Sequence, residues 1–182
     1  MVVMTTLAKN PVMVYFGQEV GEKGEGKEGF GGDDGRTTLF DYWGVPAHQA
    51  WMDSGKFDGG KLTVEQQQLR VKYQRLLKAV NNVPAIQKGV CVPLAVKGLT
   101  SKQKMYARII KNQIVLVAVN FDRNHPINQY IYLPKNWIQK YNFKSNVSNY
   151  SILGGDTIGK LQLNKPIHIQ VPTTDAIVWE LK

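Results

Sequence analysis

The residues of this 182-residue chain that could do acid–base chemistry are carboxylates near its N-terminus. Four of them stand within or beside one glycine-rich segment: Glu19, Asp33, Asp34 and Asp41. Two carboxylates held rigidly on either side of a bond can serve as nucleophile and general acid. A glycine-rich loop is poor scaffolding for such geometry. We therefore expect solvation and local pairing, for example of Asp34 or Asp41 with Arg36, and no catalytic pair among these residues.

Two other kinds of chemistry are excluded by spacing. Residues Gly24–Gly29 match the GxGxxG pattern of dinucleotide-binding loops, in which the first glycine lies at a tight turn from strand to helix. Here seven residues separate Phe16 from Gly24, and Glu25 and Glu28 would repel a phosphate. We reject nicotinamide-dinucleotide binding and expect no cofactor.

Metal binding is disfavoured in the same way. The three histidines lie far apart in sequence, at positions 48, 125 and 168. The single cysteine, Cys91, excludes an intrachain disulfide and any zinc site built on cysteines. We expect no metal site, and we expect Cys91 to be a small core residue.

Composition and charge narrow the class of protein. Hydrophobic residues make up 43% of the chain and charged residues 20%, which is ordinary for a globular protein. The net charge of +9 divides into −4 for residues 1–65 and +13 for residues 66–182. The lysines of the second part stand singly, which favours a solubilising surface over nucleic-acid binding. No apolar run approaches the ~18 residues of a membrane helix, so we expect neither nucleic acid nor a membrane as partner.

The elements expected in the N-terminal part are one strand, one long loop and one helix. Val12–Phe16 is apolar throughout, which is typical of a strand buried on both faces. A glycine-rich loop follows, from Gly17 to about Gly60. The spacing of apolar residues predicts a helix over Val64–Val80, with Thr63 and Gln66 as its capping box. A single strand–loop–helix unit cannot cover both faces of its strand, so this part is expected to be a piece of something larger.

The C-terminal part is expected to be a sheet structure. Its apolar patterns predict short strands at these positions: 90–96, 105–110, 114–119, 130–133, 160–163, 167–171 and 176–181. Turn residues such as Asn112 separate them. This pattern favours an antiparallel β-sandwich from about Gln87 to the end.

The segments Val14–Gly21 and Asp33–Trp43, followed by Trp51, resemble the end of the catalytic barrel in the α-amylase family of glycoside hydrolases. In that family the eighth strand ends in a Tyr-Tyr/Phe-Gly-x-Glu-x-Gly block, and a loop with an Asp-x-x-Arg-like pair and a tryptophan follows. Residues 116–121 resemble the central strand of the all-β domain that closes most members.

The resemblance implies a mainly β, α+β fold. An orphaned β-loop-α unit of a TIM barrel would form residues 1–86, and an antiparallel β-sandwich domain would form residues 87–182. In such enzymes the nucleophile Asp, the acid/base Glu and a third Asp lie on barrel strands four, five and seven. The resemblance therefore implies no catalytic residue here, and the chain alone is expected to be inactive.

The resemblance also implies a substrate for the parent enzyme. Its partner would be an α-glucan such as starch or a maltooligosaccharide. The residues expected beside the substrate cleft are Gln18, Glu19, Asp34, Arg36 and Trp43. Trp43 could stack on a sugar ring, although packing within the loop would explain each of the five equally well.

Two alternatives stay open at this stage. In the first, the β-sandwich is a carbohydrate-binding module without catalytic function. Trp137 and Tyr141, four residues apart, are its best sugar-stacking candidates, ahead of Tyr150 and Trp179. In the second, the fragment is structural, and the apolar segment Val12–Phe16 pairs with its copy to form a homodimer.

Overall fold

The computed structural model describes residues 1–23, 45–155 and 159–182. The chain forms two compact units. The first combines Met1–Asn10 with Arg75–Lys182, and the second is Pro11–Gln74. The boundary between these units falls inside one long helix, whereas the expected domain division after residue 86 stays a prediction.

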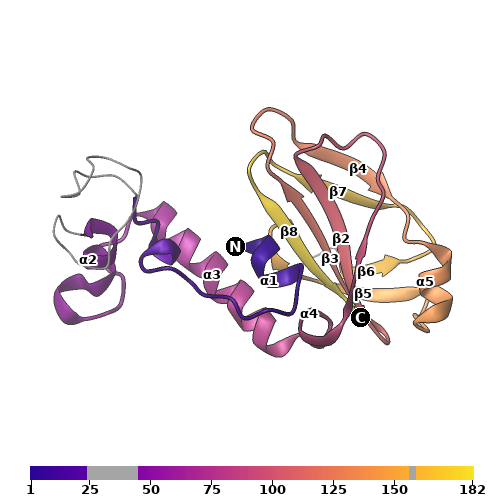
Figure 1. The fold of residues 1–182 in the computed structure, drawn as a ribbon, viewed down its shortest axis with the longest axis horizontal. Coiled ribbons are helices and arrows are strands. Elements are labelled where there is room, and N and C mark those ends of the chain that lie inside the picture. The colour runs from indigo at the N-terminus through magenta and orange to yellow at the C-terminus, as the bar shows by residue number, and fades with distance from the viewer. Residues whose placement is uncertain (24–44, 156–158) are drawn as a thin grey trace. The chain divides into compact units, whose positions relative to one another are not determined.

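A six-stranded antiparallel sheet dominates the first unit (Figure 1). Its strands, in spatial order, are β1 Val90–Pro93, β2 Gln103–Ile110, β3 Gln113–Asn120, β8 Ala176–Leu181, β5 Asn146–Leu153 and β6 Gly159–Gln162. A second sheet pairs β4 Ile127–Ile131 with β7 Ile167–Val171, also antiparallel. The unit is therefore mainly β and antiparallel, as the sequence predicted.

The core of the sandwich follows from the alternation of side chains along β3. Ile114, Leu116 and Ala118 belong to one buried cluster, together with Ile169 of β7 and Trp179 of β8. Successive strand residues point to opposite faces. The large sheet thus buries one face against the small sheet.

The opposite face of the large sheet is covered by helices. Val115, Val117 and Val119 of β3 pack in a second cluster with Leu76 and Ile86. Three helices contribute to it: α1 Val2–Thr6, the end of α3 Val64–Asn82 and α4 Pro84–Lys88. Because β3 is buried on both faces, its sequence is apolar at every position from Ile114 to Val119.

Two buried polar groups attach α1 to the sheet. The hydroxyl of Thr6 donates to the carbonyl of Val2 at 2.7 Å, so the phenol of Tyr106 is the donor in their 2.6 Å contact. Arg108 donates to the carbonyls of Leu7 and Ile86. Burial raises the pKa of Tyr106 to about 12, and the phenol stays protonated.

The second unit has a small core of Val20, Ala47 and Leu62. It contains the single turn η1 Gln18–Val20, the helix α2 Pro46–Met52, the turn η2 Asp53–Gly55 and the first part of α3. The expected capping box is confirmed. The Thr63 N–H donates to Gln66 Oε1 at 3.0 Å, and the Gln66 N–H donates to Thr63 Oγ1 at 3.3 Å.

Several sequence expectations were wrong in detail. The segment from Gly17 to Gly60 is not one loop, since its described part contains α2, which begins at Pro46. Cys91 is exposed on the edge strand β1 rather than buried. The strands of the large sheet include β5, and the sandwich includes a helix, α5 Lys135–Lys140, that the apolar pattern did not indicate.

The expected strand Val12–Phe16 is not formed. Residues 11–15 have no regular secondary structure. A strand buried on both faces needs hydrogen-bonding neighbours and covering layers. Among the described residues no strand pairs with this segment, and Met13 is 76% exposed. The homodimer expected through an exposed strand edge loses that premise. In the described part of the chain, no helix has both the length and the apolar character needed to cross a membrane.

Candidate functional site

Gln18 and Glu19 lie in η1, a single turn framed by two glycines. Gly17 and Gly21 both have positive φ, at 76° and 70°. A Cβ at Gly17 would lie 2.6 Å from the Cβ of Glu22, so only glycine fits this turn. The Gly17 carbonyl accepts hydrogen bonds from the N–H groups of Val20 and Glu22. The glycine spacing of the block thus fixes where Gln18 and Glu19 project.

The Glu19 carboxylate faces the helix α3. Its Oε1 lies 3.7 Å from a guanidinium nitrogen of Arg70, and this guanidinium stands 4.7 Å from the centre of the Trp51 ring. Burial, and then the negative charge of Glu19, raise the pKa of Tyr73 on the same helix. Glu19, Arg70 and Trp51 therefore form one connected arrangement of anion, cation and ring.

Aromatic rings continue from Trp51. The centre of the His48 ring lies 4.2 Å from that of Phe16 and 5.5 Å from that of Trp51. The rings of Trp51 and Phe57 form a T-shaped pair with their centres 5.8 Å apart. Nδ1 of His48 is buried and has no hydrogen-bond partner among the described residues. We call Phe16, His48, Trp51 and Phe57 the ring cluster. It offers stacking surface next to a charged pair.

The described carboxylates of this unit are held in structural contacts. The carboxylate of Glu22 accepts the backbone N–H of His48 at 3.0 Å. Asp53 pairs with Lys61 and Lys56, and the hydrogen bond from Lys61 comes first among the causes that lower its pKa. Among the described residues, no group of three His, Cys, Asp or Glu side chains could hold a metal ion.

Three of the predicted substrate residues, Asp34, Arg36 and Trp43, lie outside the described residues. Gln18 and Glu19 lie together in η1, where Gln18 Oε1 accepts the backbone N–H of Tyr15 at 3.2 Å. Sequence reasoning did not include Arg70, which reaches Glu19 from α3. Nothing in the sequence pattern indicated that the helix α3 meets η1.

The two residues predicted to stack on sugar at the sandwich, Trp137 and Tyr141, differ in how far their side chains are buried. Trp137, in α5, is 7% exposed and belongs to the sandwich core. Tyr141 follows α5 and is half-buried, with the Lys140 ammonium 5.4 Å from its ring centre. Of the two, only Tyr141 presents part of its ring at the surface.

A different aromatic surface lies on the outer face of the small sheet. Tyr130 and Tyr132 are 66% and 68% exposed. The Tyr130 ring stacks on His168 at 4.4 Å and 10°, and His168 Nε2 is 2.6 Å from Asn128 Oδ1. We call Asn128, Tyr130, Tyr132 and His168 the tyrosine surface. The alternation of tyrosine with an aliphatic residue over 130–133 could have indicated this surface, because burial of Ile131 and Leu133 turns the two tyrosines outward.

Comparison with known proteins gives a likeness of fold. No protein-family model matches the chain, and no curated protein sequence matches it. Two solved structures of mutants of isomaltulose synthase from Erwinia rhapontici NX5, both in complex with D-glucose, match it over its whole length. Each is 13% identical to this chain, with a TM-score of 0.52. Each match extends over 100% of this chain and over 37% of the isomaltulose synthase chain.

This likeness shows the fold. Isomaltulose synthase is an α-amylase-family enzyme, so the predicted resemblance to that family is confirmed at the level of fold. The predicted α+β class with an antiparallel β-sandwich is confirmed as well. The chain spans little more than a third of the length of the structures that it matches.

Proposed function

We propose that this chain is the C-terminal portion of an α-amylase-family glycoside hydrolase that acts on α-glucans or maltooligosaccharides. The observation that carries this proposal is the likeness to isomaltulose synthase along all 182 residues, within 37% of that enzyme's length. The glycine-framed turn of Gln18 and Glu19 supports it, because the backbone requires glycine at Gly17 and Gly21, two glycines of the family block.

In this proposal the second unit borders the substrate cleft of the parent enzyme. Gln18 and Glu19 would contact sugar hydroxyls, and Arg70 would hold Glu19 in place. Asp34, Arg36 and Trp43 are proposed for the same loop on the strength of the sequence resemblance alone. Trp51, which contacts Arg70 and His48, would help to hold the Arg70 guanidinium beside Glu19.

The chain by itself is proposed to be inactive. A retaining glycosidase needs two carboxyl groups ~5–5.5 Å apart. Glu19 of the family block has an ionic partner, Arg70, and the carboxylate of the adjacent Glu22 accepts the backbone N–H of His48. Supplying a nucleophile and an acid is therefore left to barrel strands outside this sequence.

The test is release of reducing sugar from maltoheptaose by the purified chain. We expect no turnover above that of a Glu19→Gln, Glu22→Gln double variant prepared in the same way. Turnover by the original chain that the double variant lacks would overturn the proposal of inactivity, because a contaminating amylase would be present in both preparations.

A second candidate function is glucan binding by the sandwich without catalysis, and the tyrosine surface favours it. Large exposed aromatic rings are costly to leave in water, and Tyr130 is held in place by its stack on His168. A flat ring with an amide beside it can stack on a sugar and bind its hydroxyls. We expect Tyr130→Ala and Tyr132→Ala to abolish millimolar binding of maltoheptaose in a calorimetric titration.

Tyr150→Ala is the matched control, because Tyr150 is an exposed tyrosine of the other sheet. Equal binding by all three variants, or no binding by the original chain at millimolar ligand, would remove this second candidate.

A further inference from the structure

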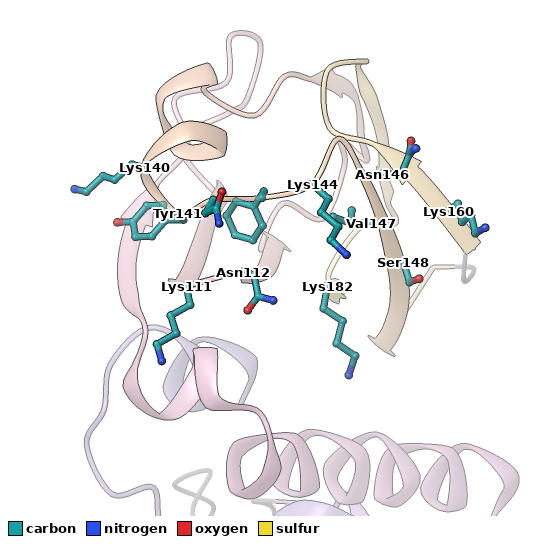
Figure 2. A pocket seen from close by; sticks show the side chains of 12 residues that line it. Lys111, Asn112, Lys140, Tyr141, Lys144, Asn146, Val147, Ser148, Lys160 and Lys182 are labelled. Atoms are coloured by element: carbon teal, nitrogen blue, oxygen red, sulfur yellow. The ribbon is translucent and has the colours of Figure 1, made fainter.

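A wide pocket opens at one end of the sandwich, in the first unit (Figure 2). Its volume is about 1140 Å³. Twelve residues line it: Lys111, Asn112, Lys140, Tyr141, Asn142, Phe143, Lys144, Asn146, Val147, Ser148, Lys160 and Lys182. We call it the lysine pocket.

The charged residues that line this pocket are all positive. Five of the twelve residues are lysines, and none of the twelve is acidic. Lys182 is paired with Glu180 at 3.0 Å, and in the described part of the chain the other four lysines form no ion pair with a carboxylate. Like charges gathered around a concave surface reinforce one another's potential.

The walls of the pocket are fixed by the fold. Lys111 and Asn112 form the turn between β2 and β3, while Lys140 ends α5. Backbone hydrogen bonds in both directions join Ser148 of β5 to Lys182, at 2.8 and 3.1 Å. The buried Phe143 anchors the segment between α5 and β5 in the core. The lysines are thus carried on a preformed frame.

The lysines do not all point the same way. Figure 2 shows Lys144 extending toward the middle of the view, where Asn112 also lies, whereas Lys111 and Lys182 extend downward, away from it. Lys140 and Lys160 extend outward at opposite ends. A ligand that used all of these charges would be elongated and would carry several negative groups rather than one.

The uncharged lining residues indicate the chemistry of the ligand's uncharged part, to which the negative groups are attached. Asn112, Asn142 and Asn146 offer amides that can both donate and accept hydrogen bonds. Tyr141 adds part of a ring face, and no arginine is among the lining residues. One ring and no guanidinium is a poor match for the stacking platforms that bind single-stranded nucleic acid. Lysine acts as a point charge for any oxyanion, whereas arginine favours bidentate geometry.

We propose that the lysine pocket binds an oligosaccharide whose sugars carry oxyanions, that is phosphate, sulfate or carboxylate groups. The saccharide part of this assignment rests on the proposed function, whereas the anionic part rests on the pocket alone. The ammonium groups bind the oxyanions, the asparagine amides bind sugar hydroxyls, and Tyr141 packs on a ring.

The experiment compares ligands and variants by calorimetry on the full chain. The ligands are maltoheptaose, phosphorylated maltoheptaose, a sulfated dextran oligomer, an oligogalacturonate and a 12-nucleotide single-stranded DNA. The pocket variant is Lys111→Gln, Lys144→Gln, and the charge-matched control is Lys97→Gln, Lys165→Gln. The two control lysines are exposed and do not line the pocket.

At least one anionic saccharide is expected to bind, and more weakly at higher salt. With ~0.7 kcal/mol lost for each lysine, the pocket variant should bind it about tenfold more weakly, and the control less than about twofold. The strongest of the three anionic ligands identifies the oxyanion. Circular dichroism of both variants checks that they are folded.

Three results would overturn the proposal. These are no binding of any anionic saccharide, equal loss of affinity in both double variants, or tighter binding of the DNA than of every saccharide. A different result would overturn the proposed function without overturning the anion site. If anionic saccharides bind in the pocket while maltoheptaose is neither bound nor hydrolysed by the parent enzyme, the anion site stands and the glucan assignment falls.

Discussion

Arg108 is a buried cation whose partners are backbone carbonyls. Its guanidinium donates to the carbonyls of Leu7, Ala85 and Ile86 at 3.0, 3.3 and 2.8 Å. The carbonyls of Leu7 and Ile86 lie at the ends of α1 and α4, where helix geometry leaves acceptors without intrahelical donors, whereas the Ala85 carbonyl also accepts the N–H of Gly89 at 3.0 Å. One side chain thus ties two short helices to β2.

Replacing Arg108 should destabilise the protein through those carbonyls. We expect Arg108→Met to lower the free energy of unfolding by about 2–3 kcal/mol, since buried acceptors lose their donors. Arg108→Lys should recover only part of the loss, because an ammonium cannot reproduce the planar fork. Urea denaturation measures both. Arg75→Met, at an exposed helix position, is the control, and equal effects at the two sites would contradict this role.

Asp122 organises the loop after β3. Its carboxylate accepts hydrogen bonds from the N–H groups of Asn124 and His125 and from the Thr100 hydroxyl, at 2.9, 3.2 and 3.1 Å. The hydrogen bond from Asn124, followed by those from His125 and Thr100, lowers the pKa of Asp122 to about 2 from its ordinary 3.8. The ionised form is therefore the one that the fold favours.

This lowered pKa has a consequence for acid stability. A folded-state pKa below the unfolded value means that the stabilisation is present above pH ~4 and is lost as the pH falls toward 2. We expect the melting temperature to drop across that interval, and to drop less in an Asp122→Asn variant. Thermal unfolding followed by circular dichroism between pH 2 and pH 6 measures this. Parallel curves for the two proteins would be inconsistent with the assignment.

At the scale of elements, α3 depends on its capping box. Thr63 and Gln66 satisfy each other's backbone N–H at a helix start where no intrahelical acceptor exists. We expect Thr63→Ala to cost about 1 kcal/mol of stability, visible as a lower urea midpoint. Ser145→Ala, at an exposed position outside any helix, should change it little. An unchanged midpoint in both variants would show that the box adds nothing.

Sequence pattern predicted elements well where one period dominates. β3 was predicted because residues buried on both faces leave a continuous apolar run, and α3 because its apolar stripe and cap agree. β5 was missed, because Asn146–Leu153 is half polar. A register shift at Ser151 and Leu153 also places Val147 and Leu153 in different clusters, so no single alternation runs through the strand.

The candidate sites were predicted less well, because they depend on which elements meet. Lysines that stand singly in sequence, such as Lys111, Lys144 and Lys182, are brought to one pocket by a turn, a loop and a strand end. Trp137 was expected to be accessible, but the inward face of α5 buries it. Val12–Phe16 failed as a strand because apolar residues specify burial only when a partner is present.

At the scale of the molecule, the two units differ in their buried clusters. The sandwich unit buries two clusters on opposite faces of one sheet. Within the described part of the unit Pro11–Gln74, one buried cluster is formed, by Val20, Ala47 and Leu62. The match to isomaltulose synthase extends over both units and covers 37% of that enzyme's chain.

The most direct test of this account is the mass of the native polypeptide, measured by mass spectrometry after capture with an antibody against the sandwich. If the chain is 37% of a parent enzyme, the native mass should be about 55 kDa, which is 20.5 kDa divided by 0.37. Peptides from the additional sequence should contain the nucleophile Asp and the acid/base Glu of the parent enzyme's barrel. A native polypeptide of 20.5 kDa would contradict the account.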